Sequence, residues 1–193
     1  MVRPTAPLYL LAGGRSERMG RDKARVSVAG LPLIRQVAVQ CGYAVDEVVV
    51  VAAPGSGYND LGFATIHDAT AHEGPFSGLL TALSHARSGP VLVAGCDQWG
   101  LTSAMLHALL AALGGGAPAA AFRGGFWNPV PLAVEASSRG SVQAAFDAGE
   151  RSVWRWLERA GAVALPEPEG WSEVVSVDDA ARAAAVERRA GWR

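Results

Sequence analysis

The feature that most limits how this chain can fold is a run of four consecutive valines at positions 48–51. No polar residue alternates with them, so a strand built from residues 47–53 is expected to be buried on both faces. Strands of that kind belong to parallel sheets that helices cover on each side. Residues 7–12 and 90–95 form two more short apolar runs, and each gives way to glycine. The chain is therefore expected to build a parallel sheet.

Helix-like segments separate these strands. Residues 31–42 repeat apolar side chains at the i, i+3, i+4 spacing of one helix face. Residues 76–87 and 102–113 are predicted helices as well, and residues 62–67 form a weaker strand. Strand and helix alternate four times. This alternation predicts an α/β fold, a Rossmann-like three-layer α/β/α arrangement around a mostly parallel sheet.

The pattern changes after residues 114–118, a Gly-rich segment that we interpret as a loop within one domain spanning residues 1–193. Residues 119–122 and 126–134 then flank a hairpin turn at Arg123-Gly124-Gly125. Two helices, two short strands and a final helix that starts at Asp178 complete the predicted elements. The first four are expected at residues 138–148, 152–160, 162–165 and 173–177.

Composition excludes several classes of protein. Hydrophobic residues make up 50% of the chain and charged residues 18%, which excludes intrinsic disorder. The net charge of −1 provides no overall positive field for nonspecific binding to nucleic acid. The chain has no secretory-signal pattern and no run of 18 apolar residues, so we expect no membrane span and a cytoplasmic location. Cys41 and Cys96 lack metal-ligand spacing and are expected to be reduced and buried.

The first candidate site is the segment directly after the first strand, because ligands of open α/β sheets bind at the carboxyl ends of the strands. Residues 13–23 contain three glycines and four cations among eleven residues. Glycines allow a ligand to approach the backbone amides, and cations suit a phosphate chain. The segment is neither a Walker A loop nor a GxGxxG turn. The alternative interpretation is a solvated loop with ordinary surface arginines.

Two aspartates follow other predicted strands. Asp68 begins residues 68–78, where Gly74-Pro75 predicts a turn before a helix, and its carboxylate is placed to accept hydrogen bonds from a nucleobase. Asp97 directly follows the strand at residues 90–95, at a position that suits a Mg²⁺ ligand. The alternatives are structural. Asp68 would cap its own loop, and Asp97 would cap the helix that begins near Thr102.

These segments together resemble the MobA-like nucleotidyltransferases, and most closely the molybdenum cofactor guanylyltransferases among them. LAGGRSERMGRDK, at residues 11–23, is similar to that family's LAGGxSxRMGxDK signature nearly residue for residue. Shorter similarities to its GPLAG, CDxP, (H/N)P and late-helix elements occur at residues 74–78, 96–97, 128–132 and 148–152. The resemblance covers about residues 7–180. It implies the fold of the nucleotide-diphospho-sugar transferases.

The resemblance also implies an activity: GMP passes from GTP to the terminal phosphate of molybdopterin, and pyrophosphate is released, with Mg²⁺ as cofactor. The residues implied to contact the nucleotide are Leu11, Ala12, Gly13, Gly14, Arg18, Lys23, Asp68 and Asp97. Arg18 and Lys23 would hold the triphosphate and serve in catalysis together with Asp97, the metal ligand. Asp68 would read the guanine. Gly14 favours GTP, because CTP-using relatives tend to have LAAG.

Alternatives and partners follow from the same resemblance. Trp99 stands near the position of the CDxP proline, where we favour packing on the sheet over a role in the acceptor site. The family's late asparagines are absent around Ser176, and Trp127 is the tryptophan best placed to touch an acceptor. The alternatives are a related transferase that uses CTP or another phosphorylated acceptor, or a non-catalytic nucleotide-binding homologue. Implied partners are GTP, molybdopterin and, transiently, proteins that deliver or receive the cofactor; nucleic acid and membrane are not expected.

Overall fold

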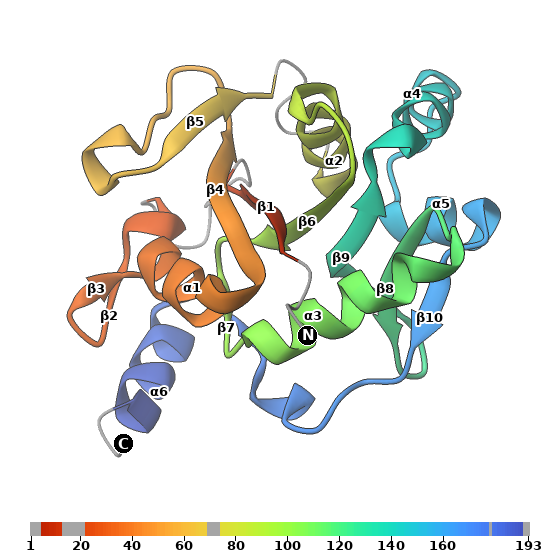
Figure 1. The fold of residues 1–193 in the computed structure, drawn as a ribbon. Helices are drawn as coiled ribbons and strands as arrows, with labels where there is room; N and C mark the ends of the chain where they lie inside the picture. The colour runs from red at the N-terminus through yellow and green to blue at the C-terminus, as the bar shows by residue number, and fades with distance from the viewer. Residues whose placement is uncertain (1–4, 13–21, 69–73, 178, 191–193) are drawn as a thin grey trace.

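A seven-stranded sheet forms the centre of the computed structural model, which describes residues 5–12, 22–68, 74–177 and 179–190 (Figure 1). The strand order is β10-β8-β9-β6-β1-β4-β5. β9 runs antiparallel to its neighbours β6 and β8, and the other pairings are parallel. The strands are β1 (Ala6–Leu11), β4 (Val45–Ala52), β5 (Ala64–His67), β6 (Pro90–Gly95), β8 (Ala119–Arg123), β9 (Trp127–Glu135) and β10 (Val163–Leu165).

Helices cover both faces of this sheet, which confirms the predicted three-layer α/β/α class. On one face, the core combines side chains from α1 (Leu33–Cys41), α3 (Ser103–Ala112) and α6 (Ala180–Ala190). On the other face, it combines side chains from α2 (Pro75–His85), α4 (Arg139–Asp147) and α5 (Val153–Ala160). The predicted valine strand is buried on both faces, as expected. Val50 belongs to the first core layer and Val49 and Val51 to the second, and all three are buried.

Most predicted elements lie within a few residues of their observed bounds. The β8–β9 hairpin is present, and Cys41 and Cys96 are free and buried as predicted. The last helix was expected to start at Asp178, which lies outside the described residues. The structure starts α6 at Ala180, and the side chain of Asp179 accepts a hydrogen bond from the amide of Arg182.

Two small ribbons were not predicted as pairs of strands, although a strand was expected at residues 173–177. β2 (Ser27–Val28) and β3 (Leu31–Pro32) form one, so the N-terminal part of the segment predicted as a helix at residues 31–42 is a strand instead. β7 (Gln98–Trp99) and β11 (Val175–Ser176) form the other, directly after β6. Two-residue strands have no periodic pattern to detect. Among the described residues, no helix is both long and apolar enough to cross a membrane.

Candidate functional site

The candidate site lies at the carboxyl edge of four adjacent parallel strands, β6-β1-β4-β5. The ladder of hydrogen bonds continues one residue beyond these strands. The amide of Cys96 donates to Leu11 O, that of Ala12 to Val51 O and that of Asp68 to Ala52 O, at 3.1, 2.8 and 2.9 Å. Hydrogen bonds of the sheet therefore fix the backbone at Ala12 and Asp68, which are predicted to bind a nucleotide, and at Cys96 next to Asp97.

Lys23 and Asp97 meet at this edge. Lys23 Nζ lies 3.3 Å from Asp97 Oδ2, although the two residues are far apart in the sequence. Both side chains are partly shielded, with 22% and 20% of their surface exposed. Lys23 opens the short 3₁₀ helix η1 (Lys23–Arg25), and Asp97 follows β6. The structure thus joins the predicted phosphate-binding cation to the predicted metal ligand.

The turn that carries Asp97 is held from three directions. Gln98 accepts a hydrogen bond from the amide of Gly95 and donates one to Val130 O on β9, both at 2.8 Å. The carbonyl of Asp97 accepts from Val177 at 3.0 Å, beside β11. A Cβ at Gly95 would lie 2.7 Å from Asp97 Oδ1, so the carboxylate folds back over the end of β6. A side chain at position 95 would displace the Asp97 carboxylate from this position.

The alternative role for Asp97 as a helix cap is wrong. Thr102 is the N-cap of α3, and its hydroxyl accepts a hydrogen bond from the amide of Met105 at 3.3 Å. Asp97 pairs with Lys23 instead. Trp99 lies in β7 and packs against the α1/α3/α6 core layer, as favoured from the sequence.

Asp68 lies at the other end of the site. It directly follows β5 and its surface is only 5% exposed. β6 and β5 are three strand spacings apart, roughly 14 Å at the usual distance between neighbours. An extended nucleotide can span such a separation, with its base near Asp68 and its phosphates near Lys23 and Asp97. Base recognition by Asp68 and its alternative role in loop capping both stay predictions.

The remaining predicted residues divide into two sets. Leu11 ends β1 and Ala12 follows it at the same edge, between the two aspartates. Gly13, Gly14 and Arg18 lie outside the described residues, so their predicted contacts with the nucleotide stay predictions.

The predicted turn before α2 has the backbone expected of it. Gly74 has a φ of 87°, and Pro75 occupies the first turn of the helix. A Cβ at Gly78 would lie 2.8 Å from the side chain of Leu11, so the missing side chain lets α2 approach the end of β1. This close packing places the start of α2 beside the site.

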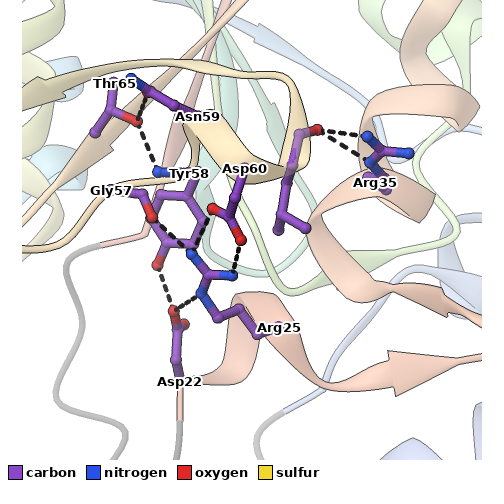
Figure 2. Close-up of polar contacts among 9 residues, drawn as sticks. Asp22, Arg25, Arg35, Gly57, Tyr58, Asn59, Asp60 and Thr65 are labelled. Carbon is purple, nitrogen blue, oxygen red and sulfur yellow. Dashed lines mark hydrogen bonds and ion pairs between the residues drawn. The ribbon is translucent and has the colours of Figure 1, made fainter.

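Sequence reasoning missed several residues around the site. Gln98 lies in a two-residue strand without periodicity, and nothing in the sequence indicates its bridging role. Tyr58, Arg25 and Asp60 belong to contacts between distant segments, shown in Figure 2. The composition does set apart Lys23, which the sequence predicted: it is the only lysine in the chain, and the other 16 of the 17 Lys and Arg residues are arginines.

The chemistry of the donor set fits one magnesium ion. Asp97 offers a single hard carboxylate, and Mg²⁺ typically takes one or two protein carboxylates and completes its shell with phosphate and water oxygens. Among the described residues, no group of three or more His, Cys, Asp or Glu side chains is arranged to hold a metal alone. A metal here would depend on the substrate for ligands. Burial raises the pKa of the neighbouring Cys96 thiol well above its usual value, which keeps that thiol neutral.

Trp127 lies at the start of β9, which reaches the same edge. Its indole donates to Glu158 Oε1 at 3.3 Å, and the Arg123 guanidinium lies 5.1 Å from the centre of its ring. These contacts hold the ring against the α2/α4/α5 core layer. They leave its predicted contact with an acceptor untested.

Comparisons with known proteins identify relatives of this chain. The family model described as MobA-like NTP transferase domain matches residues 8–163. A molybdenum cofactor guanylyltransferase from Pseudomonas putida is 33% identical over 162 residues, covering 82% of this chain and 85% of the relative. A protein of the same name from Shewanella piezotolerans is 32% identical over 160 residues, covering 80% and 78%.

Solved structures show the same fold. The molybdopterin-guanine dinucleotide biosynthesis protein A from Archaeoglobus fulgidus superposes with a TM-score of 0.80 at 20% identity, covering 97% of this chain and all of that one. A 2-C-methyl-D-erythritol 4-phosphate cytidylyltransferase from Thermus thermophilus gives 0.73 at 15% identity, covering 97% and 99%. The predicted nucleotide-diphospho-sugar transferase type of fold is confirmed.

Proposed function

The chain belongs to the MobA-like NTP transferase family and is a nucleotidyltransferase, and from this premise we propose that it transfers GMP from GTP to the terminal phosphate of molybdopterin. Pyrophosphate is the second product. The names of the relatives support the choice of nucleotide and acceptor. We further propose that residues 1–193 act as one catalytic domain in the cytoplasm.

The observation that carries this proposal is the Lys23–Asp97 pair at the carboxyl edge of the sheet. A cation and a carboxylate 3.3 Å apart compensate each other while no substrate is bound. When a triphosphate arrives, Lys23 turns from Asp97 to the phosphate oxygens, and Asp97 becomes free to accept a cation. The pair therefore presents both charges that a magnesium-nucleotide substrate requires, at one point of the edge.

The reaction joins two anions, so its barrier is largely electrostatic and positional. An oxygen of the acceptor phosphate forms a bond to the α-phosphorus of GTP as the bond to the pyrophosphate oxygen breaks. The attacking phosphate is already ionised, so the residues need not remove a proton from it. Lys23 and Arg18 would offset the negative charge of the triphosphate, and Asp68 would orient the base.

Mg²⁺ would be held by Asp97 together with substrate oxygens. When bound, it supplies positive charge that draws electron density from the phosphate oxygens. The protein's own contribution is the turn at residues 95–98, which fixes the direction of the carboxylate through Gln98 and Val177.

A transfer assay tests the proposal. Purified protein, Mg²⁺ and molybdopterin are mixed with GTP, CTP, ATP or UTP in turn, and the nucleotide conjugate and pyrophosphate are quantified. We expect both products with GTP. Transfer of CMP without GMP would show that the choice of base is wrong, and no transfer with any nucleotide would reject the reaction.

A thermal-shift series separates binding from turnover. A ligand that binds only the folded state stabilises it by RT ln(1 + [L]/Kd), about 2.7 kcal/mol at a hundred times the Kd. We expect GTP with Mg²⁺ to raise the melting temperature more than the other three nucleotides. A GTP-selective shift without transfer would favour the non-catalytic nucleotide-binding alternative.

A further inference from the structure

Asp22 and Lys23 are neighbours in sequence, but their side chains contact different segments of the protein. Lys23 reaches Asp97 at the end of β6. Asp22 Oδ1 accepts the amide of Ala24 at 3.0 Å and so caps η1, and its Oδ2 accepts the hydroxyl of Tyr58 at 2.8 Å. The carboxylate of Asp22 is thus the point at which the backbone under Lys23 is attached to the segment between β4 and β5.

Arg25 attaches the other end of η1 to the same segment, as Figure 2 shows. Its two terminal nitrogens donate to the two oxygens of Asp60 at 2.6 and 2.8 Å, and one of them also donates to Gly57 O at 2.7 Å. Its Nε lies 3.4 Å from Asp22 Oδ2. The guanidinium therefore joins both ends of η1 to residues 57–60.

Tyr58 is itself held in place. Its surface is 1% exposed, and its ring belongs to the α1/α3/α6 core layer. Its amide donates to Thr65 Oγ1 on β5 at 3.0 Å, and its carbonyl accepts from Leu61 and Phe63 at 2.9 and 3.2 Å. A rigid, buried ring consequently presents one hydroxyl to Asp22. Its burial keeps it from direct contact with a substrate.

We propose that Tyr58 is a positioning residue for transfer: its hydroxyl, acting through Asp22, fixes the one-turn helix that aims Lys23 at Asp97. This inference rests on the proposed function for its effect on turnover. A single 3₁₀ turn is too short to hold its own conformation, so contacts with the rest of the fold must set its orientation. Tyr58, Asp22 and Arg25 supply those contacts.

The Tyr58 hydroxyl keeps its role as a hydrogen-bond donor when the pH changes. Burial and the hydrogen bond to Asp22 raise the pKa of Tyr58 far above its usual value of 10.0, so it remains a donor throughout the working pH range. Arg25, next to the ring, acts in the opposite direction and is outweighed. The contact therefore does not switch with pH.

Tyr58→Phe removes the hydroxyl and keeps the ring. Tyr9→Phe is the matched control, because Tyr9 is 2% exposed and its hydroxyl bonds to His85 Nδ1 at 3.0 Å, in the opposite core layer. We expect Tyr58→Phe to lower kcat/KM for GMP transfer about tenfold, the usual scale for a lost hydrogen bond to a charged group. Tyr9→Phe should stay within about twofold of the parent enzyme, after matching for melting temperature.

A double-mutant cycle asks whether the effect passes through Lys23. In a Lys23→Met background, Tyr58→Phe should change kcat/KM by less than about twofold, since the group that it positions is gone. An equal tenfold loss in both backgrounds would mean that Tyr58 supports the fold in general, and the proposal would be overturned.

The single lysine allows a second readout that needs no turnover. An amine-acylating reagent has only Lys23 and the N-terminus to modify, and peptide mapping separates the two. Release from Asp97 should make Lys23 react several-fold faster in Tyr58→Phe and in the reference variant Asp97→Asn, but not in Tyr9→Phe. Asp60→Asn, at an exposed position, should give a smaller increase without risk to folding.

The two readouts keep the proposals separate. Unchanged acylation of Lys23 in Tyr58→Phe would reject the positioning role whatever the enzyme transfers. Faster acylation in an enzyme that transfers no nucleotide would uphold the positioning of Lys23 and reject the proposed reaction.

Discussion

At the scale of single residues, Asp97 and Lys23 compensate each other, so a change in either removes one partner of a partly shielded ion pair. Catalytic variants must be judged against this structural cost. Isosteric or charge-conserving substitutions are therefore more informative here than truncation to alanine.

Asp97→Asn should lower GMP transfer at least about a hundredfold while the fold is retained, because the amide keeps the shape but cannot supply the negative charge for a metal. Pyrophosphate release measures the first effect and circular dichroism the second. Asp97→Ala should likewise abolish transfer. Near-parental activity in either variant would place the metal ligand elsewhere.

Lys23→Ala should weaken GTP binding by about 1.5–3 kcal/mol, the scale of a hydrogen bond to a charged group. Lys23→Arg should restore only part of this loss, because a planar guanidinium does not fit a site that holds a compact ammonium beside Asp97. Isothermal titration calorimetry measures both. Arg87→Ala, an exposed cation past the end of α2, is the control. Full restoration by arginine would show that charge alone matters.

Part of this site could be predicted from single residues. Asp68 and Asp97 were found because each directly follows a predicted strand, and ligands bind where such strands end. Tyr58 could not be found, since its partner Asp22 lies 36 positions away and no local pattern joins the two. Contacts of that kind exist only once the sheet is formed.

At the scale of elements, the β7–β11 ribbon closes the turn that carries Asp97. Gly100 follows β7 with a φ of 90°, and its amide donates to Gln40 Oε1 on α1 at 3.1 Å. A Cβ there would lie 2.5 Å from the carbonyl oxygen of Glu173. Neither the backbone conformation nor the space allows a side chain.

Gly100→Ala should therefore lower the free energy of unfolding by about 3 kcal/mol, from left-handed strain and a clash with backbone together. Gly116→Ala is the matched control, because Gly116 has a φ of 81° but no atom within 4 Å of an added Cβ. That control should lose only about 1–2 kcal/mol. Urea denaturation measures both, and equal losses would show that the clash relaxes.

Elements were predictable where burial imposes a pattern. β1, β4 and β6 are short runs of apolar residues bounded by polar or glycine segments, and α1 and α2 repeat apolar side chains on one face. β7 has only two residues, too few for a period to appear. Its partner β11 lies within the strand predicted at residues 173–177, but the pairing of the two could not be predicted.

At the scale of the whole molecule, burial of ionisable groups makes the free energy of unfolding decrease at alkaline pH. Burial raises the pKa of Cys41 from 9.0 to about 12. The unfolded thiol ionises above pH 9 while the folded thiol stays neutral. The stabilisation is therefore complete below pH 9 and is lost as the pH rises towards 12. Tyr9, Tyr58 and Cys96 act in the same direction, since the pKa of each is also raised.

Cys41→Ala should make the free energy of unfolding decline less steeply between pH 9 and 11, by up to about 1.4 kcal/mol per pH unit. Urea denaturation over that range measures the slope. Val37→Ala, also fully buried in α1, should lower stability without changing the slope. If the two variants had the same slope as the parent, Cys41 would not control the alkaline limit.

The order of synthesis gives the β7–β11 ribbon a further consequence. Asp97 emerges from the ribosome well before Val177, whose amide holds its carbonyl, and before β11. A nascent chain can assemble the parallel strands β1, β4, β5 and β6 first, yet the turn at Asp97, the proposed metal ligand, lacks this hydrogen bond until the late segment is synthesised. On the proposed role of Asp97, the chain gains its fold before it gains its chemistry.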